Sequence, residues 1–372
     1  MDIEERLELI TRPPAEEVIT HEELRTLLET KDHPVAYNGL EPSGLVHLGT
    51  GLICGYKMKD FVEAGVRFKV YLATWHAWIN NKLGGDMDRI RAAARHFIHC
   101  WEALGVPVHS LEFVWPDVEY DDITYWEKFV RVAKTLSLPR ARRTLEVMGR
   151  EELEAKTVAD LLYTPMQVAD IFHFGVDICQ LGMDQRKANI VAREVGPSLG
   201  LWKPVCVHHH ILQGLAQPDK WPLPEDPLEK KKAISGVKMS KSKPKTAIFI
   251  YDSPRNIREK IRRAFAPPKY VEYNPILDIT NYIVFSEREE FTVERSEEHG
   301  GSITYTSYED LEKDYVAGAL HPADLKAAVS EFLIDRLEGV RRYFASNLEA
   351  RKILEELAGS IMELDLGQER GL

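Results

Sequence analysis

Two short stretches of this chain carry residues suited to phosphate chemistry. The first runs from Tyr37 to Thr50 and reads Tyr-Asn-Gly-Leu-Glu-Pro-Ser-Gly-Leu-Val-His-Leu-Gly-Thr. It leaves an apolar run, turns through glycine and proline, and returns to helix-like periodic sequence at His47. The first N–H groups of a helix lack partners inside the helix, so a junction of strand, turn and helix is a ready anion site. His47 adds a donor there, and Gly49 has no Cβ, so a flat ring could approach the backbone.

The second stretch is a lysine-bearing loop far downstream, which reads Lys238-Met239-Ser240-Lys241-Ser242. Taken alone, the His47 turn is more often a buried turn whose histidine is satisfied by the backbone. In this order along the chain, the two stretches resemble the two signatures of class I aminoacyl-tRNA synthetases, a His-x-Gly-x turn and a Lys-Met-Ser-Lys-Ser loop. The resemblance implies ATP binding by both stretches, at His47, Gly49, Lys238, Met239, Ser240, Lys241 and Ser242.

The same resemblance implies that His47, Thr50, Lys238 and Lys241 act in catalysis, on the phosphates and the leaving pyrophosphate. Thr50 departs from the signature, which often carries a second histidine at this position. A hydroxyl group can still donate to a phosphate oxygen, so we expect activity. The reaction needs no protein nucleophile, and catalysis should consist of positioning and stabilisation of charge. Mg²⁺ should accompany ATP, held mainly by phosphate oxygens, without a tightly bound cofactor or a structural metal.

A third block places polar residues in an otherwise apolar helical stretch. Tyr163, Gln167 and Asp170 fall at i, i+4 and i+7, so they line one helix face. A surface stripe is the simple interpretation, but the apolar neighbours favour buried ligand contacts. Here the chain resembles the tyrosyl-tRNA synthetases of archaeal and eukaryotic type. That resemblance implies that Tyr163, Gln167 and Gln185 hold the α-ammonium group of tyrosine, Tyr37 and Asp170 its phenolic hydroxyl, and Asp184, beside Gly182, the ATP ribose.

The hydrophobic pattern around these blocks alternates between strands and helices. Residues 68–73 and 111–115 read as strands, residues 89–104 and 125–148 read as helical, and Thr20 and Glu23 have the spacing of a capping box. Strands that alternate with helices predict a Rossmann-like parallel α/β sheet. Ligands bind beyond the carboxyl ends of such strands, where the strand order reverses, so we expect the 37–50 turn to lie there.

Composition restricts the class of protein. The chain has 372 residues and a formal net charge of −11, so it is long enough for two domains and unlike proteins that coat nucleic acid indiscriminately. No apolar run is long enough to span a bilayer, and the N-terminus has no secretory signal. The cysteines lie far apart in apolar contexts and predict reduced core residues of a cytoplasmic protein; they are Cys54, Cys100, Cys179 and Cys206.

Basic residues gather in two places. Arg140, Arg142 and Arg143 are bunched together, which is as typical of a solvated helix face as of an RNA contact. The resemblance implies contacts with the tRNA acceptor stem at Arg143, Arg186 and Lys187. A later helix, predicted to be capped by Ser253 and Pro254, exposes Arg255, Arg258, Arg262 and Arg263, where a solvated face is the simple interpretation.

Three consecutive histidines, His208, His209 and His210, invite a metal interpretation. On a strand the middle side chain would point to the opposite face from its neighbours. Acidic or cysteine partners are not close to them in the sequence. We therefore expect no metal site at these histidines.

We expect three parts in the chain: a helical extension at 1–30, a Rossmann-like catalytic domain at 31–266, and a mainly helical anticodon-recognition domain with a tail at 267–372. Residues 215–236 should form a surface insertion before the loop 238–242. The family resemblance spans about 34–344. It implies that His299 stacks on the first anticodon base, where other members can carry Phe, and that His321 and Asp324 bond the edge of that base.

The implied function is ligation of tyrosine to tRNA. L-Tyrosine would be activated by ATP to tyrosyl-adenylate and transferred to the 3′ end of tRNA(Tyr), by a homodimer because the family forms one. A tryptophanyl-tRNA synthetase would share the fold, but Tyr37 with Asp170 favours a phenol over an indole. A non-catalytic RNA-binding or tyrosine-sensing relative is the alternative from another class. His47 and the two loop lysines argue against a loss of chemistry.

Overall fold

The structure is a computed structural model that describes residues 1–149, 155–235, 237–241 and 243–359. It divides into two compact units, each assembled from segments that are distant in the sequence. The first unit comprises residues 1–44, 55–98 and 106–210, and the second comprises residues 45–54, 99–105 and 211–372. This division cuts the chain differently from the three functional parts expected from the sequence, and those functional bounds stay a prediction.

A six-stranded sheet with the order β1-β6-β5-β2-β3-β4 organises the first unit. Its strands are β1 (Ala15–Ile19), β2 (Val35–Leu40), β3 (Arg67–Leu72), β4 (Leu111–Val114), β5 (Ile178–Gly182) and β6 (Val205–His209). Neighbouring strands are parallel, except that β1 runs antiparallel to β6. The predicted α/β fold is confirmed. The strand order reverses between β2 and β5, so residues that follow these two strands border the expected ligand-binding edge.

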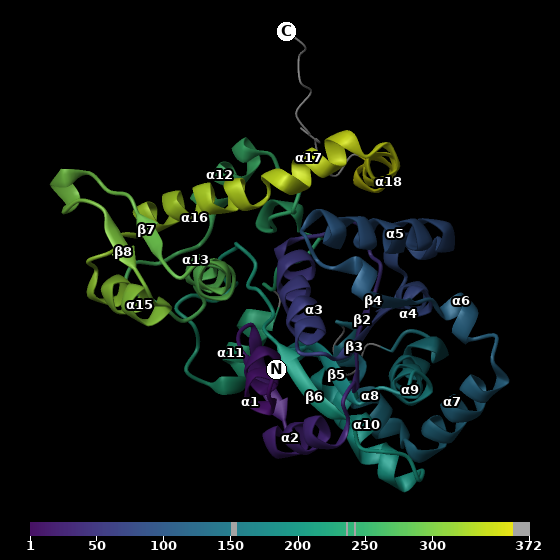
Figure 1. Cartoon of the computed structure of the whole chain (residues 1–372). Helices are drawn as coiled ribbons and strands as arrows, with labels where there is room; N and C mark the ends of the chain where they lie inside the picture. Colours follow the sequence, from purple (N-terminus) through teal and green to yellow (C-terminus); the bar gives the residue numbers. More distant parts are fainter. Residues whose placement is uncertain (150–154, 236, 242, 360–372) are drawn as a thin grey trace. The chain divides into compact units, whose positions relative to one another are not determined.

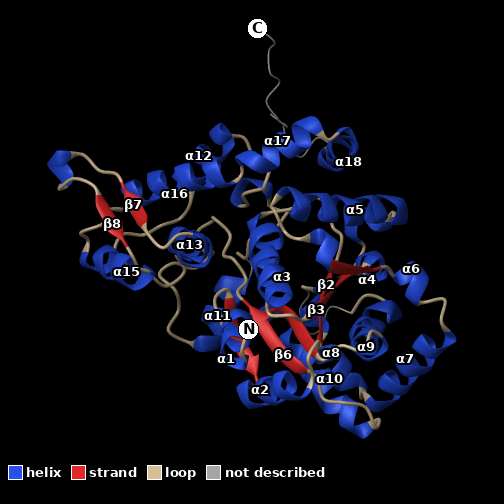
Figure 2. Ribbon diagram, viewed as in Figure 1, coloured by secondary structure: helices blue, strands red, loops and turns tan. Residues whose placement is uncertain are grey.

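Helices cover both faces of this sheet (Figures 1 and 2). They are α1 (Ile3–Thr11), α2 (His21–Thr30), α3 (Cys54–Glu63), α4 (Thr74–Ile79), α5 (Met87–Ala103), α6 (Pro116–Glu119), α7 (Ile123–Thr135), α8 (Leu138–Arg143), α9 (Val158–His173) and α10 (Arg186–Ser198). Helices α7, α9 and α10 share one core cluster with the sheet, through Val132, Val168 and Val191. The predicted capping box of Thr20 and Glu23 is present at the start of α2.

The region 125–148, which the sequence predicts to be helical throughout, is interrupted. Helix α7 ends at Thr135, and α8 begins after Ser137, whose side chain accepts a hydrogen bond from the N–H of Arg140. Pro139 lies in the first turn of α8, where its missing N–H is tolerated but a continuous helix is not. The strand predicted at 111–115 ends at Val114, because Trp115 already precedes the first turn of α6.

The second unit is mainly helical. Its helices are α11 (Pro227–Ser235), α12 (Pro254–Arg263), α13 (Pro275–Ile279), α14 (Phe285–Glu287), α15 (Tyr308–Ala317), α16 (Pro322–Arg336), α17 (Glu338–Ser346) and α18 (Leu348–Ala358). Strands β7 (Phe291–Val293) and β8 (Ile303–Tyr305) form a small antiparallel pair. Ser253 caps α12 and Pro254 is its first residue, as the sequence predicts.

The four cysteines are buried and form no disulfide, in agreement with their predicted place in the core. Within the described ranges, no helix combines the length and the apolar character that crossing a bilayer requires.

Candidate active site

Helix α9 presents a buried polar face in the first unit. A capping box between Thr157 and Asp160 fixes its start, and the helical period then places Tyr163, Gln167 and Asp170 on one side. All three side chains are buried. The interpretation of this face as a solvated stripe is therefore wrong, whereas its assignment to a ligand stays a prediction.

Hydroxyl groups surround the carboxyl group of Asp170. The hydroxyl of Tyr120 donates to Asp170 Oδ1 over 3.0 Å, and the hydroxyl oxygens of Tyr71 and Tyr120 lie 2.6 Å apart. His76 Nε2 lies 3.6 Å from Asp170 Oδ2. Burial raises the pKa of Asp170 well above its usual range and lowers the pKa of His76 to about 4. The imidazole of His76 is therefore neutral at pH 7.

Tyr37 Oη and Asp170 Oδ2 are among the buried polar atoms that have no hydrogen-bond partner within the described residues. Burial raises the pKa of Tyr37, and the nearby Asp170 raises it further. Leaving a buried donor or acceptor unsatisfied costs about 1–3 kcal/mol for each group. A ligand hydroxyl suits this pair because it both donates and accepts hydrogen bonds.

The N-terminal half of the same face carries acceptors. Tyr163 donates its hydroxyl to Glu41 Oε1 over 2.6 Å, and Gln167 Nε2 donates to Gln185 Oε1 over 3.3 Å. These bonds leave Gln167 Oε1 buried, without a partner in the part of the chain that the structure describes. A carboxylate, a phenolic oxygen and an amide oxygen form an acceptor set that suits an ammonium group.

Sequence reasoning missed four contributors to this pocket: Glu41, Tyr71, His76 and Tyr120. Two of them had a usable signal. Glu41 is the one acidic residue of the 37–50 stretch, and His76 follows β3, at the carboxyl end of a parallel strand, where ligands bind. Tyr71 and Tyr120 reach Asp170 through tertiary contacts that no local pattern announces.

The His47 turn belongs to the second unit, where it pairs with the chain that follows the lysine-bearing loop. Leu48 N–H donates to Ile248 O over 3.0 Å, and Ile250 N–H donates to Val46 O over 3.1 Å. His47 therefore lies opposite Phe249 in a short antiparallel bridge. The two predicted phosphate-binding stretches are thus joined by backbone hydrogen bonds.

The imidazole of His47 has a defined tautomer. Gly49 N–H donates to His47 Nδ1 over 3.1 Å, so the proton of a neutral ring must lie on Nε2. Burial lowers the pKa of His47 to about 3, and the charges of Lys241 and Lys238 lower it further. The ring is therefore a neutral Nε2–H donor, and both loop lysines are close enough to act on it.

The helix predicted after His47 begins irregularly. Residues Gly49–Ile53 form a π-helical turn before α3 continues in α-helical geometry, and such turns often mark functional sites. A Cβ on Gly49 would lie 3.0 Å from His47 Cε1, so the flat ring against this glycine is the imidazole of His47. Thr50 is half-buried, and its carbonyl accepts a hydrogen bond from Trp101 Nε1 over 3.1 Å.

The lysine-bearing loop is held by its backbone and by one buried side chain. Met239 N–H donates to Leu212 O over 3.0 Å, and the Met239 side chain is 4% exposed. Lys238 is exposed, while Ser240 and Lys241 are half-buried. Ser242, the last predicted residue of the signature, lies outside the described residues, as does the neighbouring Gly236.

The residues predicted to bind the ATP ribose and the acceptor stem lie in the first unit. Gly182 ends β5, and Asp184 is exposed in the turn that follows. Lys187 Nζ donates to the carbonyl of Arg143 over 3.2 Å, so these two predicted contacts are neighbours. Arg186 forms a separate ion pair with Glu17 at 2.8 Å.

The three consecutive histidines have protein partners. His208 Nδ1 lies 2.8 Å from Glu17, while Gln180 Nε2 donates to His209 Nδ1 over 2.7 Å. His210 Nδ1 lies 2.5 Å from Glu16. Across the described ranges, no group of three or more histidine, cysteine or acidic side chains is arranged to hold a metal ion.

The predicted anticodon residues lie in the second unit. His321 is the N-cap of α16 and accepts from Ala323 N–H at Nδ1, with Asp324 in the first turn. The backbone of His299 ends a short 3₁₀ turn, Glu297–His299. Arg295, which the sequence did not single out, ties these segments together because it donates to Gly301 O and Ala319 O.

Comparison with known proteins gives consistent matches over almost the whole chain. The family described as tRNA synthetases class I (W and Y) matches residues 29–222 and 227–338. A tyrosine–tRNA ligase of Pyrococcus furiosus is 45% identical, over 96% of this chain and 99% of the relative. A tyrosine–tRNA ligase of Aeropyrum pernix is 47% identical, over 97% and 99%.

Solved structures give the same result. The crystal structure of tyrosyl-tRNA synthetase from Pyrococcus horikoshii, complexed with L-tyrosine, matches with a TM-score of 0.90 and 45% identity, over 96% of this chain and 100% of that one. Plasmodium falciparum tryptophanyl-tRNA synthetase, at 14% identity and a TM-score of 0.65, shares the fold alone. The chain belongs to the class I tRNA synthetases of the tryptophan and tyrosine family and, within it, to the tyrosyl-tRNA synthetases of archaeal type.

Proposed function

We propose that the buried face of α9 binds L-tyrosine along its length. Asp170 and Tyr37 bond the phenolic hydroxyl, and Tyr163, Gln167 and Gln185 hold the α-ammonium group. The observation that carries this assignment is the pair of buried, unpartnered atoms Tyr37 Oη and Asp170 Oδ2. Phenylalanine would leave both atoms unsatisfied, whereas tyrosine supplies the missing hydroxyl.

The reaction is that of a tyrosine–tRNA ligase. In the first step the tyrosine carboxylate attacks the α-phosphate of ATP, which forms tyrosyl-adenylate and releases pyrophosphate. In the second step a terminal ribose hydroxyl of tRNA takes the tyrosyl group and releases AMP. Both steps are displacements between substrates, so the protein acts by positioning them and by stabilising charge.

Our proposal for the phosphates rests on His47 and the loop lysines. Neutral His47 donates from Nε2 to a phosphate oxygen, and Lys238 and Lys241 stabilise the charge that develops on the leaving pyrophosphate. Supporting this, the charges of both lysines already affect His47. Thr50 contributes its hydroxyl as a further donor. Asp184 and Gly182 hold the ATP ribose, and Mg²⁺ enters with ATP, coordinated mainly by phosphate oxygens.

For tRNA(Tyr), we propose two contact regions. Arg143, Arg186 and Lys187 bind the acceptor stem, and His299, His321 and Asp324 bind the anticodon. The bond from Ala323 N–H to His321 Nδ1 supports the second assignment, because a neutral ring then offers Nε2–H as a donor to a base edge. We also propose that the enzyme works in the cytoplasm as a homodimer, whose mass sedimentation equilibrium would report.

Amino-acid-dependent exchange between ATP and pyrophosphate tests the substrate assignment. We expect exchange with tyrosine, and none above background with tryptophan or phenylalanine at equal concentration. Exchange driven by tryptophan would overturn the assignment of Tyr37 and Asp170 to a phenol. Charging of tRNA(Tyr), measured on the same preparation, tests the second step separately.

A further inference from the structure

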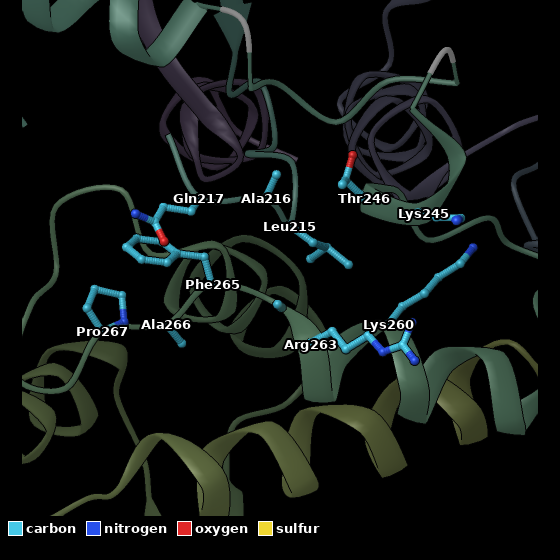
Figure 3. A pocket seen from close by; sticks show the side chains of 11 residues that line it. Leu215, Ala216, Gln217, Lys245, Thr246, Lys260, Arg263, Phe265, Ala266 and Pro267 are labelled. Carbon is cyan, nitrogen blue, oxygen red and sulfur yellow. The ribbon is translucent and has the colours of Figure 1, made fainter. Parts of the chain in front are cut away.

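A pocket of about 380 Å³ lies in the second unit, apart from every residue assigned above. Figure 3 shows side chains from three segments around it: Leu215 to Gln217, Lys245 with Thr246, and the end of α12 with the residues that follow it. Leu215 joins the segments, because its N–H donates to Thr246 O over 2.9 Å and its carbonyl accepts from Phe265 N–H over 2.8 Å. The pocket walls are therefore fixed by backbone hydrogen bonds.

One side of this pocket is cationic. The amino groups of Lys245 and Lys260 lie at the same side, with the Arg263 guanidinium nearby (Figure 3). Lys260 is bound to Asp252 at 2.6 Å and Arg263 to Glu259 at 2.7 Å. Lys245 forms no ion pair with any residue that the structure describes, so the set keeps a net positive charge. Such a set suits a phosphate group.

The other side is apolar and aromatic. The Phe265 ring, Pro267 and the Gln217 amide lie there (Figure 3). The ring is half-buried and packs edge-on against Trp221, with ring centres 4.8 Å apart. An aromatic face beside an amide offers a nucleobase a stacking surface and hydrogen bonds at its edge.

Positive charge continues from the pocket along the protein surface. Arg255 and Arg262 are exposed on α12 and have no ion pair among the described residues, and Lys243 is exposed two residues before Lys245. A free nucleotide would need only the pocket, whereas a nucleic-acid backbone would use these outer charges too. On a chain with a net charge of −11, this patch favours RNA.

We propose that the pocket binds one nucleotide of the substrate tRNA, with its backbone phosphate at Lys245, Lys260 and Arg263 and its base against Phe265. The proposal rests on the proposed function, which supplies the RNA. The pocket adds a docking point for tRNA to the acceptor-stem and anticodon contacts. The residues that we assign to tyrosine and ATP take no part in it.

Charge reversal in the full-length enzyme tests the proposal. We expect Lys245→Glu and Arg263→Glu each to weaken tRNA(Tyr) binding about tenfold at moderate salt. Each should also reduce the slope of log affinity against log salt concentration by about one unit, since one phosphate contact is lost. Tyrosine-dependent pyrophosphate exchange should not change. Lys352→Glu, which makes the same charge change at an exposed position of α18, is the matched control.

Phe265→Leu separates the two sides of the pocket. It should weaken tRNA binding a few-fold without changing the salt slope, because stacking displaces no counterions. Thermal unfolding of each variant shows whether the fold is kept. Should Phe265→Leu unfold, the charge-reversal pair still decides.

Two outcomes would overturn the proposal. If tRNA affinity is unchanged in both charge variants, the pocket does not hold RNA. If exchange falls while tRNA affinity is kept, the pocket serves a free nucleotide instead. Failure of the proposed function is a different result, because the unmutated enzyme would then show no tyrosine-dependent exchange.

Discussion

The tyrosine pocket in the first unit and the phosphate-handling region in the second unit are built in opposite ways. In the pocket, buried side chains hold one another before substrate arrives, as Tyr120 holds Asp170. In the phosphate region, backbone pairing fixes the chain, and the cationic side chains stay at least half-exposed. Buried atoms that lack a partner discriminate between similar molecules. Charges on a shaped backbone instead act on any triphosphate.

Replacing Asp170 should break the discriminating side of this comparison and have the largest effect. Asp170→Ala removes the acceptor for the phenol, so tyrosine-dependent exchange should collapse while the weak exchange with phenylalanine changes little. Tyrosyl-tRNA synthetases are themselves the standard illustration of this discrimination, at about 10⁵-fold, so that figure is not a result for this chain. The measurement is the ratio of kcat/KM for the two amino acids.

Tyr71→Phe is the control for that experiment. It removes a hydroxyl that contacts Tyr120 and not Asp170, so the ratio should fall far less. If Asp170→Ala keeps the full preference for tyrosine, Asp170 is not the partner of the phenol.

Replacing Lys241 should break the catalytic side alone. Lys241→Ala removes a charge that acts on the leaving pyrophosphate, and adenylate formation should slow by about 10²–10³-fold. Tyrosine affinity, measured by titration without ATP, should not change. Single-turnover kinetics measure the rate, with Lys352→Ala as a control of equal charge change. An unchanged single-turnover rate would remove the loop from catalysis.

Gly49→Ala sharpens the comparison by disturbing shape without altering charge. The new Cβ would lie 3.0 Å from His47 Cε1 and 3.2 Å from His47 Nδ1, so the ring must move and its bond with the Gly49 N–H weakens. We expect adenylate formation to slow by about tenfold, the cost of one misplaced hydrogen bond. Gly339→Ala has open space around its Cβ and should leave the rate unchanged.

The smallest effect concerns buried neutral histidines. Burial lowers the pKa of His209 to about 4, below its usual value near 6.5. Between these two values the unfolded chain binds more protons than the folded one, so stability is full above pH 6.5 and falls as the pH drops toward 4. The contribution at stake is about 2–3 kcal/mol.

Denaturant unfolding at pH 7 and pH 4.5 measures this effect. His209→Asn keeps an acceptor for the Gln180 amide but cannot take up a proton, so its stability should fall less between the two pH values. Equal losses in the variant and the unmutated protein would mean that His209 does not carry the acid sensitivity.

The sequence predicted best those features that a local period or a contiguous motif encodes. Tyr163, Gln167 and Asp170 could be placed on one face because a helix repeats every 3.6 residues. Ser253 with Pro254 marked a helix start for an equally local reason. The break between α7 and α8 was also readable, since Pro139 follows a residue that can cap.

Features made by tertiary contact could not be predicted in this way. The hydrogen bond from Tyr120 to Asp170 joins residues 50 positions apart, and the bond from Tyr163 to Glu41 joins residues 122 apart. The neutral state of His47 depends on burial and on lysines almost two hundred residues downstream. Chemical type and spacing named the candidates, but their protonation and partners came only with the fold.

The interleaving of the two units has a consequence for synthesis of the chain. Strand β1 pairs with β6, from Ala15 to His209, and the His47 turn pairs with residues near Phe249. A nascent chain therefore cannot complete either unit from the residues first made, and the ends of these long loops must meet late. Until residue 250 has emerged, the His47 segment has no strand to pair with and its apolar side chains stay uncovered. A fragment that stops before that point would carry the His47 signature without the backbone that gives it shape, and would be prone to aggregate.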